Sequence, residues 1–551
     1  MKIRNLILGL LACVGSGVAV ADELISVELL PNPEMNEDVN ADGWPDGWPT
    51  VSGGESLVDD GRPYIRIEQG EAGAFNMLYR EVRVPSRYRA LRFEIDSRVI
   101  DIVRGADLWN EARIIFQFKD LNNKKLSPKP RPVILGKKGT SDWRKRSVEF
   151  LVPEGAITLE IMTGHFMSKS GIVDIRSMSL QPVAEEALLV RRAEYLLKNP
   201  KPIEIPFEAP IPAQFPPEVF VVGNRLKTAA GDEVWLQGAN VPSMEWVATG
   251  ERIMQSTAHL IEQWNVNCIR LPVHEDYWLG TADGSKDGGQ AYRHLVDSVV
   301  NYCSNRGVYV VIDLHRFRAP RVEHVTFWES AAARYANHPA VLFDLLNEPH
   351  SISWELWRNG GDILQRKTPA DEDNFLSEEA RKKARSSFYS PGMQALVAAV
   401  RSTGARNVVI AGGLDWAYDL SGIVNGYALE ESEAADGNGI MYSTHIYPWK
   451  SGWQSKVLDA AALHPIFIGE VGADEIIMSW MPEEVQGDPA TWVPDMLGLI
   501  QRERLNWTAW CFHPSASPRM LEDWTYKPTP FWGAPAKAAL LGESFELKRL
   551  R

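Results

Sequence analysis

The sequence is poor in cysteine, in positive charge and in long apolar segments. Its 551 residues include 4 Cys, and 72 acidic side chains outnumber 58 basic ones, so the formal net charge is −14. An acidic surface repels nucleic acid and anionic membranes, and we expect neither as a partner. After the first 21 residues, no stretch stays apolar over the length that a membrane span requires. No spacing of Cys and His indicates a zinc site.

Residues 1–21 have the pattern of an export signal. Two basic residues precede a mainly apolar stretch, residues 6–20, and Ala19-Val20-Ala21 matches the small-residue cleavage motif. The pattern predicts a mature chain that begins near Asp22 and is secreted or periplasmic. The residues up to Cys13 faintly resemble a lipoprotein motif, but the apolar stretch continues past this cysteine, which disfavours a lipid anchor.

Removal of this signal would leave Cys268, Cys303 and Cys511. An odd number of cysteines in an oxidising compartment argues against a framework of disulfides. Cys268 and Cys511 lie in strand-like runs, so we expect both to be buried free thiols.

Residues 22–183 are predicted to form an all-β domain. Short runs alternate between apolar and polar residues, for example Leu91-Arg92-Phe93-Glu94-Ile95, and clusters of Gly, Pro, Asn and Asp separate them. Several short strands at this spacing are typical of a β-sandwich.

Residues 184–215 are predicted to link this domain to the next. A charged helix over residues 184–199 is followed by a stretch in which seven of residues 200–217 are proline. Proline at this density makes a connector extended and stiff.

Residues 216–551 are predicted to form an α/β domain, a (β/α)8 TIM barrel. Helical patterns lie between most of eight short apolar runs, although the fifth helix is poorly defined. A doubly wound open sheet is the alternative. The runs are Val234–Asn240, Cys268–Val273, Val308–His315, Val341–Pro349, Asn407–Gly413, Gly439–Tyr447, Pro465–Gly472 and Asn506–Phe512.

Polar residues end six of the eight runs, which is costly in a buried strand unless these groups are paired or face a site. In a TIM barrel, the C-terminal ends of all strands meet at one mouth, where the catalytic groups lie. Glu348 is near the end of the fourth run and Glu470 near that of the seventh. Retaining glycosidases hold two carboxyl groups about 5 to 5.5 Å apart, on either side of the bond that they cleave. The pair therefore predicts a glycosidase, against the alternative of salt bridges at the barrel mouth.

Other residues stand at the strand ends in the same order as in a known family. The set is Arg270, His315, Asn347-Glu348, His445-x-Tyr447, Glu470 and Trp510. With these residues the chain resembles glycoside hydrolase family five, a cellulase-like family of retaining (β/α)8 enzymes, over about residues 216–551. Asn-Glu-Pro alone is a weak motif, and the order of the whole set carries the resemblance.

The resemblance implies the roles of the charged groups. Glu348 is expected to be the acid/base, which must be protonated when the leaving group departs. Glu470 is expected to be the nucleophile that forms a glycosyl-enzyme intermediate. Arg270 and Tyr447 are expected to hold Glu470 charged and oriented.

The resemblance also implies substrate contacts. Asn347 is expected to bind the 2-hydroxyl of the sugar, a contact that strengthens in the transition state. His315 and His445 are expected to line the cleft, with His445 near Glu348. Trp510 is expected to form the floor on which the sugar stacks.

Further aromatic residues follow strand ends and are candidates to extend the cleft. They are Trp246, Trp278, Trp449 and Trp532. Sugar stacking and packing within a loop both explain an aromatic residue at such a place. The loop from His350 to Ser390 is long enough to form one wall of the cleft.

The first domain loosely resembles jelly-roll carbohydrate-binding modules, in its segments Asn40–Trp48 and Val173–Leu180. Sugar binding and a purely supporting role both remain open for it. Trp109 and Trp143 are candidates either for stacking on sugar or for the core.

An acidic, turn-rich segment near the start of this domain suggests a structural Ca²⁺ site as one of two interpretations. Its candidate ligands are Asp38, Asn40, Asp42 and Asp46. The spacing does not match an EF-hand loop, because no glutamate stands at the twelfth position. A plain turn cluster is the other interpretation, and we expect no other cofactor.

Together these features predict a retaining glycosidase that acts on a polysaccharide or oligosaccharide, as a monomer. An endo-β-1,4-glucanase is favoured, and β-mannan, β-1,3-glucan and a glycolipid headgroup are alternative substrates for the same chemistry. A carbohydrate-binding protein with an inactive barrel and a transglycosylase are the alternatives from other classes.

Overall fold

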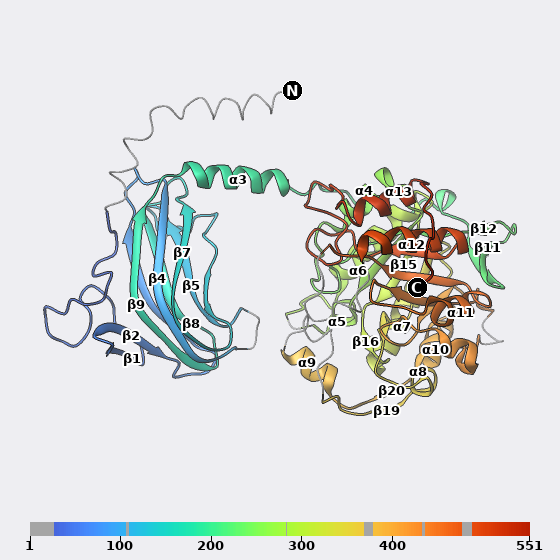
Figure 1. Ribbon diagram of the computed structural model, residues 1–551, viewed down its shortest axis with the longest axis horizontal. Helices are drawn as coiled ribbons and strands as arrows, with labels where there is room; N and C mark the ends of the chain where they lie inside the picture. The colour runs from blue at the N-terminus through green and yellow to red at the C-terminus, as the bar shows by residue number, and fades with distance from the viewer. Residues whose placement is uncertain (1–26, 106–108, 283, 368–377, 432–435, 476–487) are drawn as a thin grey trace, which may run out of the picture. The chain divides into compact units, whose positions relative to one another are not determined.

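The computed structural model describes residues 27–105, 109–282, 284–367, 378–431, 436–475 and 488–551. The predicted export signal lies outside these ranges. The chain folds into two compact units; the first ends at Leu197 and the second begins at Lys198 (Figure 1). Each unit has a hydrophobic core of its own.

The first unit is a sandwich of two antiparallel sheets. One has the strand order β1 (Gly54–Asp59), β2 (Arg62–Glu68), β9 (Ser170–Pro182), β4 (Ala90–Val103), β7 (Gly139–Leu151). The other has the order β3 (Phe75–Arg83), β8 (Thr158–Phe166), β5 (Ala112–Lys119), β6 (Val133–Gly136). Strands that follow one another in sequence mostly lie in opposite sheets. This is the predicted jelly roll.

Alternate side chains of the two sheets meet in the core of the sandwich. Along β5 burial alternates, and Ile114 and Phe116 are fully buried. The rings of Phe93, on β4, and Phe116 lie 5.1 Å apart, so the two sheets touch through aromatic side chains. Helix α3 (Glu186–Lys198) follows β9 and matches the helix predicted over residues 184–199.

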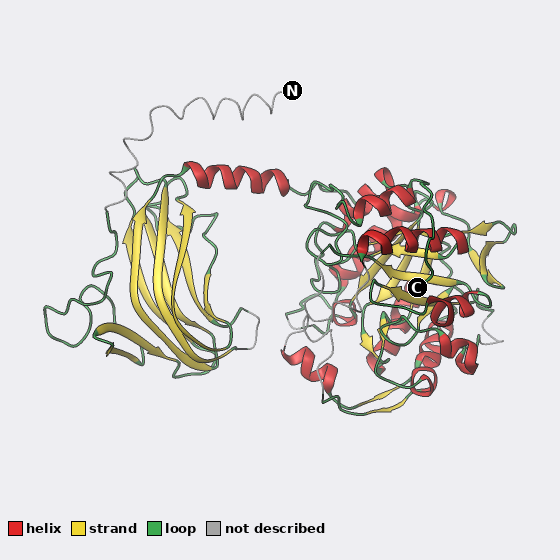
Figure 2. Ribbon diagram, in the orientation of Figure 1, coloured by secondary structure: helices red, strands yellow, loops and turns green. Residues whose placement is uncertain are grey.

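The second unit is a closed barrel of eight parallel strands, drawn in yellow in Figure 2. This confirms the TIM barrel and makes the open-sheet alternative wrong. The strands are β13 (Gln237–Asn240), β14 (Cys268–Val273), β15 (Tyr309–Leu314), β17 (Val341–Asp344), β21 (Val409–Gly412), β22 (Ile440–Ile446), β23 (Ile466–Val471) and β24 (Asn506–Ala509).

Helices lie between most of the barrel strands. They are α4 (Ile253–Gln263), α5 (Glu275–Leu279), α6 (Gln290–Ser304), α7 (Val322–Arg334), α8 (Trp354–Asn359), α9 (Glu378–Arg385), α10 (Met393–Ser402), α11 (Asp459–Ala461), α12 (Pro489–Glu503) and α13 (Gly533–Leu540), with the short helices η1 (Pro212–Gln214), η3 (Ile423–Tyr427) and η4 (Gln454–Leu458). None of the helices in the described ranges combines the length and apolarity needed to cross a membrane.

Two of the eight predicted runs are each divided in the structure. The first run contributes β12 (Glu233–Val234) to a small antiparallel sheet with β10 (Val219–Val222) and β11 (Arg225–Thr228), and only β13 enters the barrel. The fourth run ends as a barrel strand at Asp344. Glu348 instead begins β18 (Glu348–Pro349), which pairs with β16 (Phe317–Arg318). An apolar run in sequence does not show where the chain leaves the barrel.

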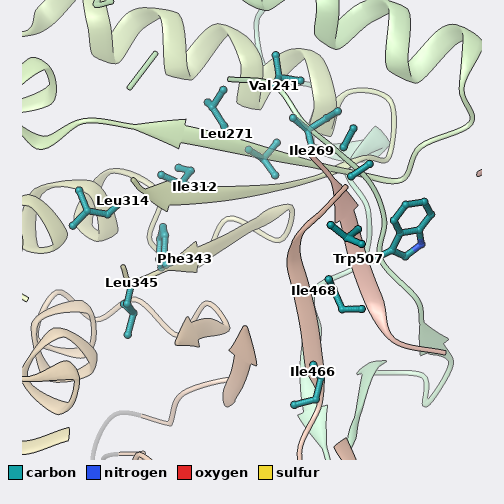
Figure 3. Close-up of a cluster of buried hydrophobic side chains, with 14 of the residues drawn as sticks. Val241, Ile269, Leu271, Ile312, Leu314, Phe343, Leu345, Ile466, Ile468 and Trp507 are labelled. Atoms are coloured by element: carbon teal, nitrogen blue, oxygen red, sulfur yellow. The ribbon is translucent and has the colours of Figure 1, made fainter. Parts of the chain in front are cut away.

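Side chains of the barrel strands alternate between the helices and the interior. Ile269 of β14 and Ile312 of β15 belong to the large cluster that includes the apolar faces of the helices (Figure 3). Cys268 and Val311 belong to a separate cluster inside the barrel. Because side chains alternate along a strand, Arg270, two residues after Cys268, also faces the interior.

The small sheet closes the N-terminal end of the barrel. Val219 of β10 and Leu226 of β11 are buried in the interior cluster. Other members of this cluster, such as Cys268, Tyr309 and Met441, stand at or next to the first residues of their strands. The polar residues at the C-terminal ends of the strands therefore lie above this layer.

The proline-rich segment lies against the barrel unit. The carbonyl of Pro200 accepts a hydrogen bond from the guanidinium of Arg252 (2.7 Å), and the N–H of Ile211 donates to Asn305 Oδ1 (2.7 Å). The connector is thus held by hydrogen bonds along the barrel surface as well as stiffened by its prolines.

Cys268, Cys303 and Cys511 are buried free thiols. Burial raises the pKa of each thiol above its ordinary value. The prediction for Cys268 and Cys511 is confirmed, and the third cysteine behaves in the same way.

Candidate active site

A fully buried arginine lies at the centre of the barrel mouth. Arg270 Nε and Nη2 lie 3.0 and 2.9 Å from Asp344 Oδ2, and Nη2 lies 3.0 Å from Asp313 Oδ1. Nη1 donates to Asn240 Oδ1 over 3.0 Å. The guanidinium is therefore held in one orientation by side chains from three other strand ends.

Gly469 leaves the space that this arginine needs. A Cβ at position 469 would lie 2.7 Å from Ser443 Oγ, 3.0 Å from His445 Nε2 and 3.4 Å from Arg270 Nε. A larger residue would push against the buried groups around the nucleophile candidate, which is the next residue along the chain.

Glu470 is bound through both carboxylate oxygens. Arg270 Nη1 lies 3.1 Å from Oε1, and the hydroxyl of Tyr447 donates to Oε2 over 2.6 Å. The pairing of β22 with β23 shifts register between Thr444 and His445, so the strand is irregular where Glu470 stands. The structure brings Arg270 and Tyr447 onto Glu470, the two contacts that the sequence predicts.

Glu348 and Glu470 converge although 122 positions separate them. His445 Nδ1 lies 3.0 Å from Glu348 Oε1 and 3.6 Å from Glu470 Oε2. One carboxylate oxygen of each glutamate and a ring nitrogen of His445 all lie within 4.8 Å of one another. This upper limit fits the about 5 to 5.5 Å that separates the carboxyl groups of retaining glycosidases and lies below the about 6.5 to 9.5 Å of inverting ones.

The buried acids of the site hold protons more tightly than exposed ones. Burial raises the pKa of Glu470, against the opposing effects of Arg270 and of the Tyr447 hydroxyl. Burial likewise raises the pKa of Asp313 and of Asp344, and Arg270 opposes it. Three carboxyl groups surround one guanidinium, so they cannot all be ionised without an excess of buried negative charge.

Burial disfavours the charged form of both histidines of the site. Burial lowers the pKa of His315 to about 3 and lowers the pKa of His445 well below its ordinary value. Each ring can then donate from one nitrogen and accept at the other. Nδ1 of His315 lies 2.7 Å from Asp313 Oδ2, which indicates that this nitrogen carries the proton.

Asn347 offers an unused donor at the site. Its Oδ1 accepts from Arg270 Nη2 over 2.9 Å, and its side chain is 1% exposed. Its amide Nδ2 has no hydrogen-bond partner within the described chain. A buried donor without a partner is costly, so this nitrogen is set to bind an incoming acceptor such as a hydroxyl.

Trp510 follows β24 and packs on His315. The two rings are stacked, with centroids 5.5 Å apart and planes 10° apart. The indole nitrogen donates to the carbonyl of Ser517 over 3.2 Å. These contacts hold the ring in place at the mouth, with 8% of the residue exposed.

For two of the four tryptophan candidates, Trp278 and Trp532, the prediction that they extend the cleft is wrong. Trp278 lies in α5, is fully buried, packs against Phe327 and donates to Ser330 Oγ over 3.0 Å. Trp532 is also fully buried and donates to the carbonyl of Trp510 over 2.7 Å. Both rings anchor loops to the barrel core, a role that their place after a strand does not distinguish from sugar stacking.

The other two aromatic candidates remain accessible. Trp246 is 42% exposed and presents its ring edge-on to His513. Trp449 is partly exposed and stacks on Tyr447, with ring centroids 5.0 Å apart. Stacking of sugar on these two rings stays a prediction.

The sequence-based interpretation missed Asn240, Asp313 and Asp344, the side chains that bind Arg270. A signal was present: a buried arginine needs acceptors, and a carboxylate inside an apolar strand needs a cation. Only the barrel geometry shows that these residues share one interior layer.

The four calcium candidates serve as acceptors within their turn. Asp38 accepts from the N–H groups of Asp42 (3.1 Å) and Gly43 (3.0 Å), and Asp46 accepts from that of Val39 (2.7 Å). The turn-cluster interpretation accounts for these contacts. Calcium binding stays a prediction.

The two tryptophan candidates of the sandwich differ in exposure. The ring of Trp143 packs against the guanidinium groups of Arg176 (3.8 Å) and Arg98 (4.7 Å) and the ring of Tyr64. Trp109 is 56% exposed. The ring of Trp143 is therefore packed against other side chains of the sandwich, whereas the ring of Trp109 is accessible to a ligand.

A closed (β/α)8 barrel with two carboxyl groups this close at its mouth defines a retaining glycosidase. The cellulase family, glycosyl hydrolase family 5, matches residues 228–516. The chain belongs to this family of retaining glycosidases. The predicted resemblance and the predicted class of enzyme are thereby confirmed.

Curated relatives are distant endoglucanases. Endoglucanase E-5 of Thermobifida fusca is 22% identical over 308 residues, which cover 53% of this chain and 55% of that protein. Endoglucanase A of Butyrivibrio fibrisolvens is 22% identical over 267 residues, 46% of this chain and 52% of that protein. The chain thus spans about half the length of the curated relatives it matches.

Solved structures of similar proteins include a β-glucanase from Saccharophagus degradans in complex with cellotetraose. It has 22% sequence identity and a TM-score of 0.45, over 61% of this chain and 98% of that chain. The catalytic domain of a Thermobifida fusca endoglucanase, also with cellotetraose, has 17% identity and a TM-score of 0.40, over 59% of this chain and 97% of that chain.

Proposed function

We propose that Glu348 is the acid/base and Glu470 the nucleophile of a double displacement. Glu470 attacks the anomeric carbon while Glu348 gives its proton to the leaving oxygen. Glu348 then takes a proton from the water that hydrolyses the glycosyl-enzyme intermediate. The approach of the two carboxyl groups within 4.8 Å is the observation that carries this proposal.

The contacts of each carboxyl group support this division of roles. Arg270 and the Tyr447 hydroxyl both favour the ionised form of Glu470, as a nucleophile requires. Glu348 contacts His445, and burial disfavours the charged form of this ring, so the contact adds no cation that would hold Glu348 ionised.

We propose β-1,4-glucan as the substrate, cleaved within the chain. Membership of the cellulase family and relatives that are named endoglucanases support this choice. The donor on Asn347 fits the 2-hydroxyl of a β-1,4-linked glucose unit, although it does not distinguish this sugar from its competitors. β-Mannan and β-1,3-glucan are the competing substrates, since the same groups would act on either.

A panel of soluble β-glucans, β-mannan and xylan tests the proposal. New reducing ends should appear fastest with β-1,4-glucan, and Glu470→Gln should lower the rate by at least about 10³-fold, because it removes the nucleophile. A rate that survives in this variant would overturn the role of Glu470. Faster release from mannan would overturn the substrate.

We propose that the reaction needs no metal or other cofactor. Protein groups bind the carboxylate of Glu470 and supply the proton, so every step of the displacement has a donor or acceptor within the chain. Dialysis against EDTA should leave the rate unchanged. A loss that Ca²⁺ or another divalent ion restores would contradict this proposal.

We propose that the sandwich binds the same polysaccharide on the outer face of its four-stranded sheet. Phe75 and Tyr79 point outward from β3 and are 64% and 42% exposed. Phe166, on the neighbouring β8, packs edge-on against Phe75 with ring centroids 4.9 Å apart. Exposed aromatic rings on one face of a sheet suit the apolar faces of sugars.

We propose that the protein is secreted or periplasmic, on the strength of the N-terminal pattern alone. N-terminal sequencing of the protein recovered from the producing cell should begin near Asp22. A retained N-terminus or a lipid on Cys13 would contradict this.

A further inference from the structure

A segment outside the barrel holds the backbone on both sides of Glu348. In the two-residue bridge, Glu348 of β18 pairs with Phe317 of β16. The N–H of Glu348 donates to the carbonyl of Arg316 over 3.1 Å, and that of His350 donates to the carbonyl of Arg318 over 3.1 Å. The position of the Glu348 carboxyl group therefore depends on where β16 lies.

An insertion between α8 and α10 folds back onto this segment. Its two arms form the hairpin of β19 (Gly361–Ile363) and β20 (Phe388–Ser390), and α9 precedes β20. Figure 1 shows α9, β19, β20 and β16 at the same end of the barrel unit. Contacts between the insertion and β16 would link the insertion to the backbone of Glu348.

Arg318 makes this connection. Its side chain is buried, and Nη1 donates to the carbonyls of Ala384 (3.0 Å) and Ser386 (3.3 Å). Nη2 donates to the carbonyl of Leu364, on the other arm of the insertion. One guanidinium thus binds both arms, while the backbone of the same residue pairs with β18.

Arg321 forms a second set of contacts with the insertion. Its Nη2 donates to the carbonyl of Lys383 over 2.9 Å, and its guanidinium lies 3.6 Å from the ring centroid of Phe388 on β20. These contacts lie beyond β16 and do not include the backbone pairing of Glu348.

The backbone of Arg318 is in the left-handed region, with φ of +76°. A side chain other than glycine rarely adopts this conformation, and it persists where the surroundings hold it in place. Here the surroundings are the carbonyls of the insertion on one side and the backbone of β18 on the other.

We propose that Arg318 is a positioning residue for the acid/base Glu348. Its guanidinium fastens the insertion to β16, and β16 in turn sets the place of β18. The inference rests on the proposed role of Glu348 and goes beyond it, because it gives the insertion a part in proton transfer. Displacement of a reacting group by about 1 Å can cost about 100-fold in rate.

The dependence of rate on the leaving group separates a positioning role from a general loss of structure. Phenolate is a poor leaving group and needs the proton from Glu348, whereas 2,4-dinitrophenolate departs without it. Both aryl glycosides are made from the disaccharide repeat of the polysaccharide that the wild type cleaves fastest. The measured quantity is kcat/KM, which reports on the first displacement.

Arg318→Gln should lower kcat/KM for the phenyl glycoside by about 10- to 100-fold and change that of the dinitrophenyl glycoside by less than about twofold. Arg318→Lys keeps the charge and part of the hydrogen bonding, so it should fall between the variant and the wild type. Equal losses on both substrates, or no loss on either, would overturn the positioning role.

Two reference variants make the outcome specific. Arg358→Gln removes an arginine of α8 that donates to the carbonyl of Ala428 over 3.0 Å and has no place in the β16–β18 bridge; it should show no difference between the substrates. Glu348→Ala should show a larger difference than Arg318→Gln. If Glu348→Ala shows none, the proposed role of Glu348 fails, and the inference falls for that separate reason.

A second variant covers failure of Arg318→Gln to fold, which circular dichroism would reveal. Phe388→Ala removes the ring under Arg321 and loosens the insertion from its surface side. It should lower the phenyl rate by a smaller factor and leave the dinitrophenyl rate unchanged. Identical ratios in this variant and the wild type would then overturn the proposal.

Discussion

The hydroxyl of Tyr447 donates a hydrogen bond to Glu470 Oε2 over 2.6 Å and makes no other hydrogen bond within the described residues. Tyr447→Phe should therefore lower kcat by about 10- to 100-fold, because Glu470, the proposed nucleophile, loses one of its two fixed contacts. Loss of the donor should also raise the pKa of Glu470 further. Steady-state rates between pH 3 and 8 measure both effects.

Tyr309→Phe is the matched control for this variant. The hydroxyl of Tyr309 donates to the carbonyl of Pro217 over 2.7 Å, at the opposite end of the barrel. Its loss should lower the free energy of unfolding by about 1 kcal/mol and leave kcat unchanged. A similar fall in kcat for both variants would mean that Tyr447 acts only through stability.

In the proposed mechanism, Glu470 limits the wild-type pH profile on its acid side. Attack requires the ionised carboxylate, and burial raises its pKa above the ordinary value for glutamate. Activity is therefore lost as the pH falls through the raised pKa, at a higher pH than for an exposed carboxyl group. A fall of kcat/KM only below about pH 4 would contradict the raised pKa.

Sequence placed single residues at the barrel mouth best where a polar group stands at or near the end of an apolar run, as Glu348, Glu470 and Tyr447 do. Their contacts with Arg270 and with one another came from the family resemblance or from the structure. The prediction for Trp278 failed because a tryptophan that follows a strand can pack in the core as readily as it can stack on sugar. Asp344 was missed because only the closed barrel brings it to Arg270.

At the scale of elements, the sheet of β10, β11 and β12 should contribute stability without affecting catalysis. Leu226→Ala should lower the free energy of unfolding by about 2 to 5 kcal/mol, because it removes a fully packed side chain from the interior cluster. Denaturant unfolding measures this loss. kcat at 25 °C should stay at the wild-type value. A fall in kcat of the folded protein would show that the apolar layer at the N-terminal end affects the site at the C-terminal end.

Hydrophobic pattern predicted the number and order of the barrel strands but not the ends of the fourth. Residues 341–349 are apolar enough for one long strand, yet the chain leaves the barrel after Asp344 and pairs again at Glu348. The partner of this second pairing is β16, whose residues precede their partners in β18 by 31 positions. Pairing between segments distant in sequence leaves no trace in the periodicity of either one.

At the scale of the whole molecule, binding and hydrolysis should be separable. Substituting alanine for both Phe75 and Tyr79 should weaken adsorption to insoluble β-glucan by about tenfold, since each exposed ring contributes about 0.5 to 1.5 kcal/mol. Hydrolysis of soluble glucan should be unchanged, because the catalytic residues belong to the other unit. Depletion of protein from solution over the solid measures the adsorption.

A Trp109→Ala variant is the comparison for this experiment. Trp109 is exposed but does not lie in the outer face of β3 and β8. Adsorption lost with Trp109 and kept in the double variant would move the binding surface away from the four-stranded sheet. If both the double variant and Trp109→Ala adsorb as well as the wild type, the sandwich does not bind glucan through these rings, and a purely supporting role is favoured.

The apolar layer at the N-terminal end of the barrel limits how substrate, water and products can reach and leave the site. Val219, Leu226 and the side chains around them fill the interior at the N-terminal end, so the described residues leave no passage from one end of the barrel to the other. The proposed glycan, the attacking water and both proposed products must therefore use the same opening. Departure of the first fragment has to precede arrival of water at the glycosyl-enzyme, and a sugar that lingers there can take the place of water as the acceptor.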